Sequence, residues 1–382
     1  MNKSFNRFTY IFFFFHGCFF TGNQLMVHYS AQALLAGEKT LGIMIGAFYT
    51  GSMVMVLLLG EISERVGKRI GAFMAAVIYS TGAFFISFAD SIPFMIASYF
   101  LFGSGVGSLE GMWFSFIGDV NGEETGKQMN LAQAVFSVGA ILSPLLLANL
   151  LVFVSFRLVY VFIGIFMAAL SLFFLFRRSI DALAIKSDKA VSGLTMFRLV
   201  RSPLMLALML VLIVNIGSET SLTYWLPNYF GYYGAAGLGA TGLSLYWLAS
   251  VPGRFLASRL KNHSLTLVFS FLLCILGVGI ILAMGQVELK LIGVFITGMA
   301  LAPVYPCVAS LGASLFPNNS ASAFSLMVFS CGFGGALAQP LISRAAEKAS
   351  VSAVYRALLA IMLALSVSSF LLFRVFSKRS KT

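Results

Sequence analysis

Long apolar stretches separated by short polar turns run along almost the whole chain. An α-helix needs about 20 predominantly apolar residues to cross a bilayer, and twelve stretches meet this requirement. They do not show the ~10-residue alternation of apolar and polar positions that marks the strands of a membrane β-barrel. The pattern predicts an all-α membrane protein with twelve transmembrane helices, at 8–33, 40–62, 70–89, 92–118, 128–152, 155–177, 203–232, 237–260, 264–285, 288–314, 319–343 and 351–376.

The composition supports this interpretation. Apolar residues make up 59% of the 382 residues and charged residues 10%, whereas soluble domains average about 45–50% and about 25%. A soluble globular protein of this composition would have too few polar residues to form a surface in contact with water. A disordered chain would contain fewer aromatic residues and more charge. Both classes are therefore excluded, and a polytopic membrane protein remains.

The basic residues predict the orientation in the membrane. Lys and Arg number 25 against 13 Asp and Glu, which gives a net charge of +12. Because Lys and Arg collect in cytoplasmic loops, we interpret this excess as a topology signal and expect no nucleic-acid partner. With both termini in the cytoplasm, 18 of the 25 basic residues fall on the cytoplasmic side and 6 on the other. We expect a multi-pass protein of a plasma membrane (the inner membrane of a bacterium).

A polar stretch after the sixth predicted helix divides the chain into halves. It runs from Arg177 to Ser202 and is the longest such stretch in the sequence. We therefore expect an N-terminal bundle over 1–178, a cytoplasmic central loop over 179–202 and a C-terminal bundle over 203–382, each bundle with six helices.

An internal repeat relates the two predicted bundles. The fifth apolar stretch carries a Gly-Ala-x-x-x-Pro-Leu string from Gly139 to Leu145, and the eleventh carries the same string from Gly335 to Leu341. The same spacing places the first stretch on the seventh and the fourth on the tenth. Two six-helix halves related by a parallel repeat and joined by a basic loop resemble the layout of major facilitator transporters, whose halves rock about a site near the bilayer midplane.

The turn after the second predicted helix carries a charged motif, Gly-Glu-Ile-Ser-Glu-Arg-Val-Gly-Lys-Arg, over 60–69. It resembles the signature of major facilitator transporters between their second and third spans, with Glu64 where the family usually has Asp. The resemblance implies gating, in which the acid and the basic residues break and reform ion pairs. The alternative is a charged loop that only follows the positive-inside rule. The candidate gating residues in this turn are Gly60, Glu64, Arg65, Gly67, Lys68 and Arg69.

Arg254 belongs to a degenerate counterpart of this motif, which runs from Gly253 to Leu260 in the second half. It lies inside the eighth apolar stretch, near its cytoplasmic end. Two interpretations stay open: the side chain snorkels to the interface, or it pairs with an acid of the gating loop. We include Arg254 among the candidate gating residues.

Two acids lie well inside predicted helices, Glu110 in the fourth and Glu219 in the seventh. Ionisable groups at membrane depth are costly and are functional candidates by default. An offset of 195 relates Gln24 to Glu219 and Glu110 to Tyr305, so four polar residues occupy equivalent depths. The other candidates for binding or coupling are amides and aromatic residues in the same or neighbouring helices: Asn23, Trp113, Asn130, Gln133, Asn215, Trp225 and Gln339.

These side chains suit a polar, neutral and polyhydroxylated ligand, because amides and carboxylates bond hydroxyls and aromatic faces stack on C–H surfaces. The alternative is hydrogen bonding between helices, which uses the same residue types in membranes. His16 and His28, near opposite ends of the first stretch, either form part of a proton relay or pack at the interfaces. The four cysteines lie in apolar stretches without metal-site spacing, so we expect packing roles and no metal.

The fourth and fifth stretches resemble those of the fucose permease group of sugar:proton symporters. The resemblance rests on Glu110 and on the run from Asn130 to Ala140, with Pro144 shortly after. It implies sugar transport driven by protons. The acid that this group carries in its first span aligns near Gln24, which cannot titrate, so proton coupling would fall to Glu110 or Glu219. Uniport, or coupling to another ion, stays open.

We therefore predict a secondary active transporter that moves a small polar solute, with a sugar as one candidate, by proton-coupled alternating access. An exporter of a metabolite or drug is the alternative, although the Gly-Pro-rich antiporter motif is absent from the fifth stretch. No catalytic constellation, metal motif or nucleotide-binding loop appears, so we expect neither an enzyme nor a cofactor. The expected partners are the solute, a proton or other ion, and membrane lipids, and we expect a monomer.

Overall fold

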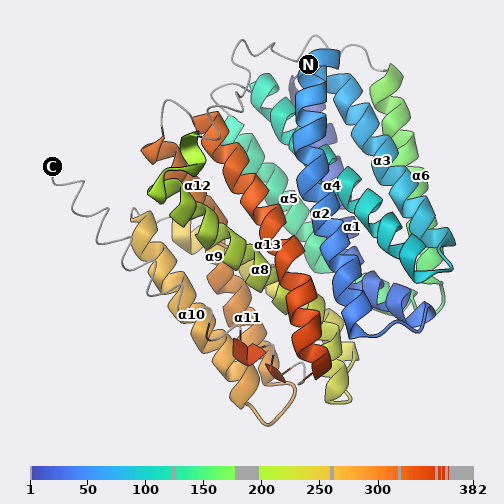
Figure 1. Cartoon of the computed structure of the whole chain (residues 1–382), viewed down its shortest axis with the longest axis vertical. Helices are drawn as coiled ribbons and strands as arrows, with labels where there is room; N and C mark the ends of the chain where they lie inside the picture. Colours follow the sequence, from blue (N-terminus) through green and yellow to red (C-terminus); the bar gives the residue numbers. More distant parts are fainter. Residues whose placement is uncertain are drawn as a thin grey trace. The chain divides into compact units, whose positions relative to one another are not determined.

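The protein consists of helices in the computed structural model (Figure 1). The structure describes residues 2–121, 125–176, 198–258, 262–316, 320–348, 352–353, 355–357 and 360. No strand occurs among these residues, which confirms the all-α prediction. The helices are α1 (Asn2–Ala33), α2 (Glu38–Val66), α3 (Lys68–Phe88), α4 (Ile92–Asn121), α5 (Thr125–Leu150), α6 (Phe156–Phe176), α8 (Pro203–Tyr232), α9 (Gly237–Ser258), α10 (His263–Ala283), α11 (Lys290–Leu301), α12 (Val304–Leu315) and α13 (Ser320–Lys348).

The helices agree with the first eleven predicted spans, with one difference. The predicted span at 288–314 is two helices, α11 and α12, because the chain turns between Leu301 and Val304. Pro303 lies in this turn, and a proline removes one backbone donor and clashes with the preceding turn of a continuous helix. The twelfth predicted span lies almost wholly outside the described residues.

Among the described helices, nine are long and apolar enough to cross a membrane. The chain is an integral membrane protein.

The chain forms two compact units, Met1–Ala190 and Val191–Thr382. In the first unit, α4 packs against α2 and α3, α1 packs against α5, and α3 packs against α6. In the second unit, α8 packs against α13, and α11 packs against α9 and α10. Most of the predicted central loop lies outside the described residues.

The internal repeat reappears in the packing of each unit. Gly103 of α4 lies against the backbone of α2, and a side-chain carbon at this position would collide with the Phe48 carbonyl oxygen. Gly298 of α11, 195 residues later, lies against the backbone of α9, where a side-chain carbon would collide with the Tyr246 carbonyl oxygen. Small residues allow membrane helices to approach closely. Each unit therefore uses a glycine at the same register for the equivalent helix contact.

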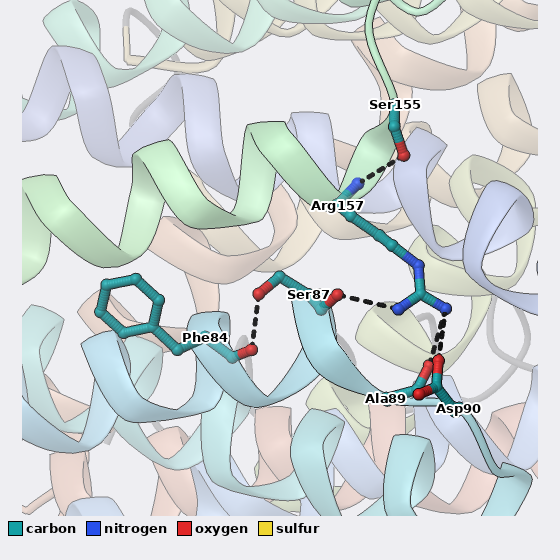
Figure 2. Close-up of polar contacts among 6 residues, drawn as sticks. All are labelled: Phe84, Ser87, Ala89, Asp90, Ser155 and Arg157. Atoms are coloured by element: carbon teal, nitrogen blue, oxygen red, sulfur yellow. Dashed lines mark hydrogen bonds and ion pairs between the residues drawn. The ribbon is translucent and has the colours of Figure 1, made fainter.

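Arginines join α3 and α6 at both ends. The Arg157 guanidinium, at the start of α6, donates to the carbonyl oxygens of Ser87 and Ala89 at the end of α3, each at 3.0 Å, and to the Asp90 carboxylate (Figure 2). The Arg69 guanidinium, at the start of α3, donates to the last carbonyls of α6, at Phe174 (3.1 Å) and Leu175 (2.8 Å). The last carbonyls of a helix have no partner within the helix, and cations are favourable there.

Candidate functional site

The first unit places an acid beside a histidine. Glu110 of α4 has a side chain that is 33% exposed, and one of its carboxylate oxygens lies 3.7 Å from Nε2 of His16 on α1. The two residues are 94 positions apart in the sequence, and the contact between α1 and α4 brings them together. His16 is not among the binding and coupling candidates that the sequence favoured, because no spacing rule links it to Glu110.

His16 lies in an apolar and aromatic environment. The residue is 0% exposed, and neither ring nitrogen has a hydrogen-bond partner among the described residues. Its ring stacks on Phe12, with centroids 5.3 Å apart, and meets Phe136 of α5 and the edge of Tyr79 of α3. The hydroxyl of Tyr79 is also buried without a described partner. Buried polar groups normally have hydrogen-bond partners, so this is a locally unsatisfied cluster.

The second unit places the other intramembrane acid beside a cation. Glu219 of α8 and Arg254 of α9 interact electrostatically. The structure thus assigns Arg254 an acid within its own unit. This contact was not among the two interpretations of the sequence, which were snorkelling and pairing with the gating loop.

Asn215 lies one helical turn before Glu219. It is 1% exposed, and both polar atoms of its amide lack a hydrogen-bond partner among the described residues. The hydroxyl of Ser244 on the neighbouring α9 is buried and unpartnered in the same sense. An unsatisfied buried polar group costs roughly 1–3 kcal/mol. Such groups are therefore candidates for bonding a ligand or water.

Two of the predicted ligand residues bond each other. The indole N–H of Trp225 on α8 donates to Oε1 of Gln339 on α13 at 3.1 Å. The Gln339 amide nitrogen donates to Oγ1 of Thr220 at 3.0 Å, and the Thr220 hydroxyl donates to the Gly217 carbonyl. Trp225 and Gln339 are both fully buried. These contacts join two packed helices, which is the structural alternative that the sequence left open.

Asn23 takes part in a similar chain of hydrogen bonds in the first unit. The Tyr160 hydroxyl of α6 donates to Oδ1 of Asn23 at 2.7 Å. Tyr160 lies 3.0 Å from the Tyr99 hydroxyl of α4, which lies 3.0 Å from the Ser30 hydroxyl. All four side chains are buried, and they link α1, α4 and α6. Gln24, the next residue to Asn23, is also buried.

The remaining binding candidates differ in their surroundings. Trp113 is fully buried among phenylalanine rings, with Phe12 stacked at 4.7 Å, and its indole nitrogen has no described hydrogen-bond partner. Gln133 of α5 and Tyr305 of α12 are partly exposed. The side chain of Asn130 lies outside the described residues. Trp113 and Gln133 take no part in the Glu110 and Glu219 contacts described above.

The structure shows the surroundings of four candidate gating residues of the turn. Gly67 has φ of +95°, a conformation that favours glycine, and it both ends α2 and begins α3. Lys68 donates to the Asp119 carboxylate of α4 at 2.7 Å. Arg69 bonds the end of α6. Gly60 lies in α2 with open space around its α-carbon among the described atoms. The side chains of Glu64 and Arg65 lie outside the described residues.

No group of three or more His, Cys, Asp or Glu side chains that could hold a metal occurs in the part of the chain that the structure describes. The described site chemistry therefore consists of two acid-centred contacts and several buried amides and hydroxyls.

Comparisons with known proteins connect the chain to one family. Residues 9–339 match the Major Facilitator Superfamily. The chain is 21% identical over 351 residues to the glucose/mannose transporter GlcP of Bacillus subtilis (strain 168), which covers 88% of this chain and 86% of the relative.

Two solved structures show the same fold. The nucleoside transporter NupG has a TM-score of 0.76 at 13% identity, over 96% of this chain and 98% of that one. A variant of the E. coli fucose:proton symporter FucP has a TM-score of 0.63 at 19% identity, over 95% of this chain and 99% of that one. At these identities the likeness concerns the fold alone.

Proposed function

The chain belongs to the Major Facilitator Superfamily, and we propose that it is a proton-coupled secondary transporter that moves a small neutral solute of the sugar class by alternating access. It is a membrane transporter by family. The solute, the coupling ion and the mechanism are the parts that we propose. The resemblance of the fourth and fifth helices to the fucose permease group supports the same proposal.

Asn215 is the observation that carries the solute class. A fully buried amide offers two N–H donors and a carbonyl acceptor, and in this structure both of its polar atoms lack a described partner. A sugar hydroxyl both donates and accepts, so it can satisfy each of these atoms. Ser244 adds a further unpartnered hydroxyl from α9. The relative named as a glucose/mannose transporter supports a monosaccharide as the solute.

The two intramembrane acids support coupling to an ion. Glu110 and Glu219 lie in the middle parts of α4 and α8, where an ionisable side chain is costly unless it has a function. Each has a neighbour of opposite or potentially opposite charge, His16 or Arg254. We propose that the proton binds in one of these two contacts and that the solute binds beside Asn215.

The distribution of basic residues supports a plasma-membrane location with both termini in the cytoplasm. We propose that the protein works as a monomer surrounded by lipid. Alternating access would then move the two units with respect to the membrane faces, and the gating turn around Gly67 would take part in this movement.

A ligand screen tests the solute class. Purified protein is heated in detergent with D-glucose, D-mannose, L-fucose, uridine, amino acids and organic acids at two pH values. Ligand binding to the folded state raises the unfolding temperature by mass action. We expect stabilisation by at least one monosaccharide and none by the amino acids and organic acids. Stabilisation by uridine, an amino acid or an organic acid alone would contradict the sugar proposal, and an organic acid would favour export of a metabolite.

A further inference from the structure

We propose that the second unit contains a binding site for a primary ammonium group, built from aromatic rings and a helix end, and that the chain fills this site itself with Lys290. Lys290 is the first residue of α11, and only 2% of it is exposed. In the part of the chain that the structure describes, no carboxylate forms an ion pair with it. A buried cation without an anion is costly, so other groups must stabilise it. This site depends on neither the proposed solute nor the proposed coupling ion.

The first of these groups is the end of α10. The Lys290 ammonium donates to the carbonyl oxygen of Ile281 at 2.7 Å. Ile281 is one of the last four residues of α10, whose carbonyls have no partner within the helix. These carbonyls carry the negative end of the helix dipole, so a cation is favourable beside them. The site therefore offers a strong acceptor for one N–H group of an ammonium.

Two tyrosines near the end of α8 form the walls of the site. The Lys290 ammonium lies over the ring of Tyr233, 4.8 Å from its centroid, and over the ring of Tyr229 at 5.6 Å. Aromatic faces attract a cation within about 6 Å of the ring centroid. The ammonium also donates to the Tyr229 hydroxyl at 3.4 Å, and this hydroxyl donates to the Ile281 carbonyl at 3.0 Å. Ring faces and oxygen acceptors thus take the place of a carboxylate.

The walls of the site are held in place by contacts of their own. Tyr229 is 1% exposed, and its ring packs against Tyr355, with centroids 4.5 Å apart, and against Tyr233 at 5.3 Å. The Tyr355 hydroxyl donates to the Leu222 carbonyl of α8 at 3.4 Å. None of these contacts involves Lys290. We therefore expect the site to keep its form when the lysine side chain is shortened.

The contacts define the class of ligand. A primary ammonium has three N–H donors, which suit the Ile281 carbonyl and the Tyr229 hydroxyl. A quaternary ammonium has the charge but no N–H to donate to these oxygens. A neutral alcohol of the same size lacks the charge that the ring faces attract. The site should therefore distinguish a primary alkylammonium from both of these compounds.

The tether to the chain gives the site a role in holding three helices. Lys290 begins α11, and its ammonium binds the ends of α8 and α10. A ligand that belongs to the same chain has an effective concentration of about a millimolar or higher, so the site stays filled. The ends of α8 and α10 therefore stay with the start of α11.

Chemical rescue tests the site directly. Lys290→Ala removes three methylene groups and the ammonium, which together have the size of n-propylammonium. Thermal unfolding of the full-length protein in detergent is measured with n-propylammonium, tetramethylammonium or n-propanol at equal concentrations. We expect Lys290→Ala to unfold at least about 4 °C below the unmodified protein. n-Propylammonium should restore at least half of this loss and should not change the unmodified protein, whose site is filled. No rescue, or equal rescue by either of the other two compounds, would overturn the proposal.

The matched control for the loss of the lysine is Lys39→Met, compared with Lys290→Met. Lys39 is exposed in the first turn of α2, and methionine keeps most of the apolar stem of a lysine without its charge. Surface substitutions have small effects on stability, so Lys39→Met should unfold within about 2 °C of the unmodified protein. An equal loss in Lys39→Met and Lys290→Met would show a general effect of charge and would contradict a specific site.

A double-mutant cycle tests the ring face and does not require Lys290→Ala to fold. Tyr233→Leu removes the ring, and Lys290→Met removes the ammonium that lies over it. Because the two groups interact, we expect Tyr233→Leu to lower the unfolding temperature by less than half as much in Lys290→Met as in the unmodified protein. Tyr233→Phe keeps the ring face and should cost less than Tyr233→Leu. Equal losses from Tyr233→Leu in both backgrounds would overturn the proposal.

Discussion

Arg69 and Arg157 join the same two helices from opposite ends. Each lies in the first turn of one helix and donates to the last carbonyls of the other, Arg69 from α3 to α6 and Arg157 from α6 to α3. Between them, the Ser80 hydroxyl donates to the Gly164 carbonyl at 2.8 Å in the buried middle of the contact. We infer that α3 and α6 move as a rigid pair, whatever the first unit does during transport.

The first prediction concerns the stability of this pair. Arg157→Ala removes two charge-assisted bonds to backbone carbonyls, and we expect a loss of about 1.5 kcal/mol, seen as a lower unfolding temperature in detergent. Asp90→Ala is the matched control, because it removes only the exposed carboxylate that Arg157 also contacts. An exposed ion pair contributes about 0–1 kcal/mol. A larger effect of Asp90→Ala than of Arg157→Ala would show that the carbonyl bonds are not the stabilising contacts.

The second prediction concerns the bond between Trp225 and Gln339. Gln339→Leu leaves the indole N–H and the Thr220 hydroxyl without this partner, at a cost of about 1–3 kcal/mol. Adding Trp225→Phe to Gln339→Leu should recover part of the loss, since both bonding groups are then gone. Thermal unfolding of the two single variants and the double variant measures this coupling. Strictly additive losses would contradict the bond.

The third prediction compares a glycine that is packed against a neighbouring helix with a glycine that meets open space. Gly103→Ala places a methyl group against the Phe48 carbonyl oxygen, so we expect low yields of folded protein. Gly60→Ala meets open space among the described residues, and alanine favours the helix by roughly 1 kcal/mol. We expect Gly60→Ala to fold normally, as monodispersity on a sizing column would show. A collapse of folding in Gly60→Ala would show that another part of the chain covers Gly60.

The fourth prediction concerns Asn215. Asn215→Leu replaces an amide that has no described partner, so we expect the protein without solute to be no less stable than before. Each lost hydrogen bond to a solute weakens binding by about 1 kcal/mol, so with two bonds lost we expect binding of the best monosaccharide from the screen to fall by at least tenfold. Isothermal titration measures the affinity. Unchanged affinity would remove Asn215 from the binding site.

The fold follows from the sequence because its elements are long and uniform. A span of about 20 apolar residues has one stable conformation in a bilayer, since every backbone polar group must be satisfied within the segment. The break at Pro303 is the interruption that a proline causes in a helix. The glycine contacts at Gly103 and Gly298 depend on which helix packs against which. The repeat indicated their equivalence but could not name the neighbouring helix.

The candidate site follows from the sequence only in part. Acidic residues are rare at membrane depth, and this identified Glu110 and Glu219. Both have charged or titratable neighbours in the structure. It did not identify the neighbour of Glu110, because helical periodicity shows which face a residue occupies but not what covers that face. For the same reason the sequence could not show that Trp225 and Gln339 bond each other. Their residue types suit a ligand as well as a bond between helices.

Proton-driven accumulation of a sugar in proteoliposomes tests the central proposal most directly. Liposomes that contain the purified protein are placed in labelled D-glucose or D-mannose with an inward proton gradient and no other source of energy. A proton-coupled sugar transporter accumulates the label above the outside concentration, and a protonophore abolishes this accumulation. Uptake that only reaches the outside concentration, or that a protonophore does not change, would contradict proton coupling.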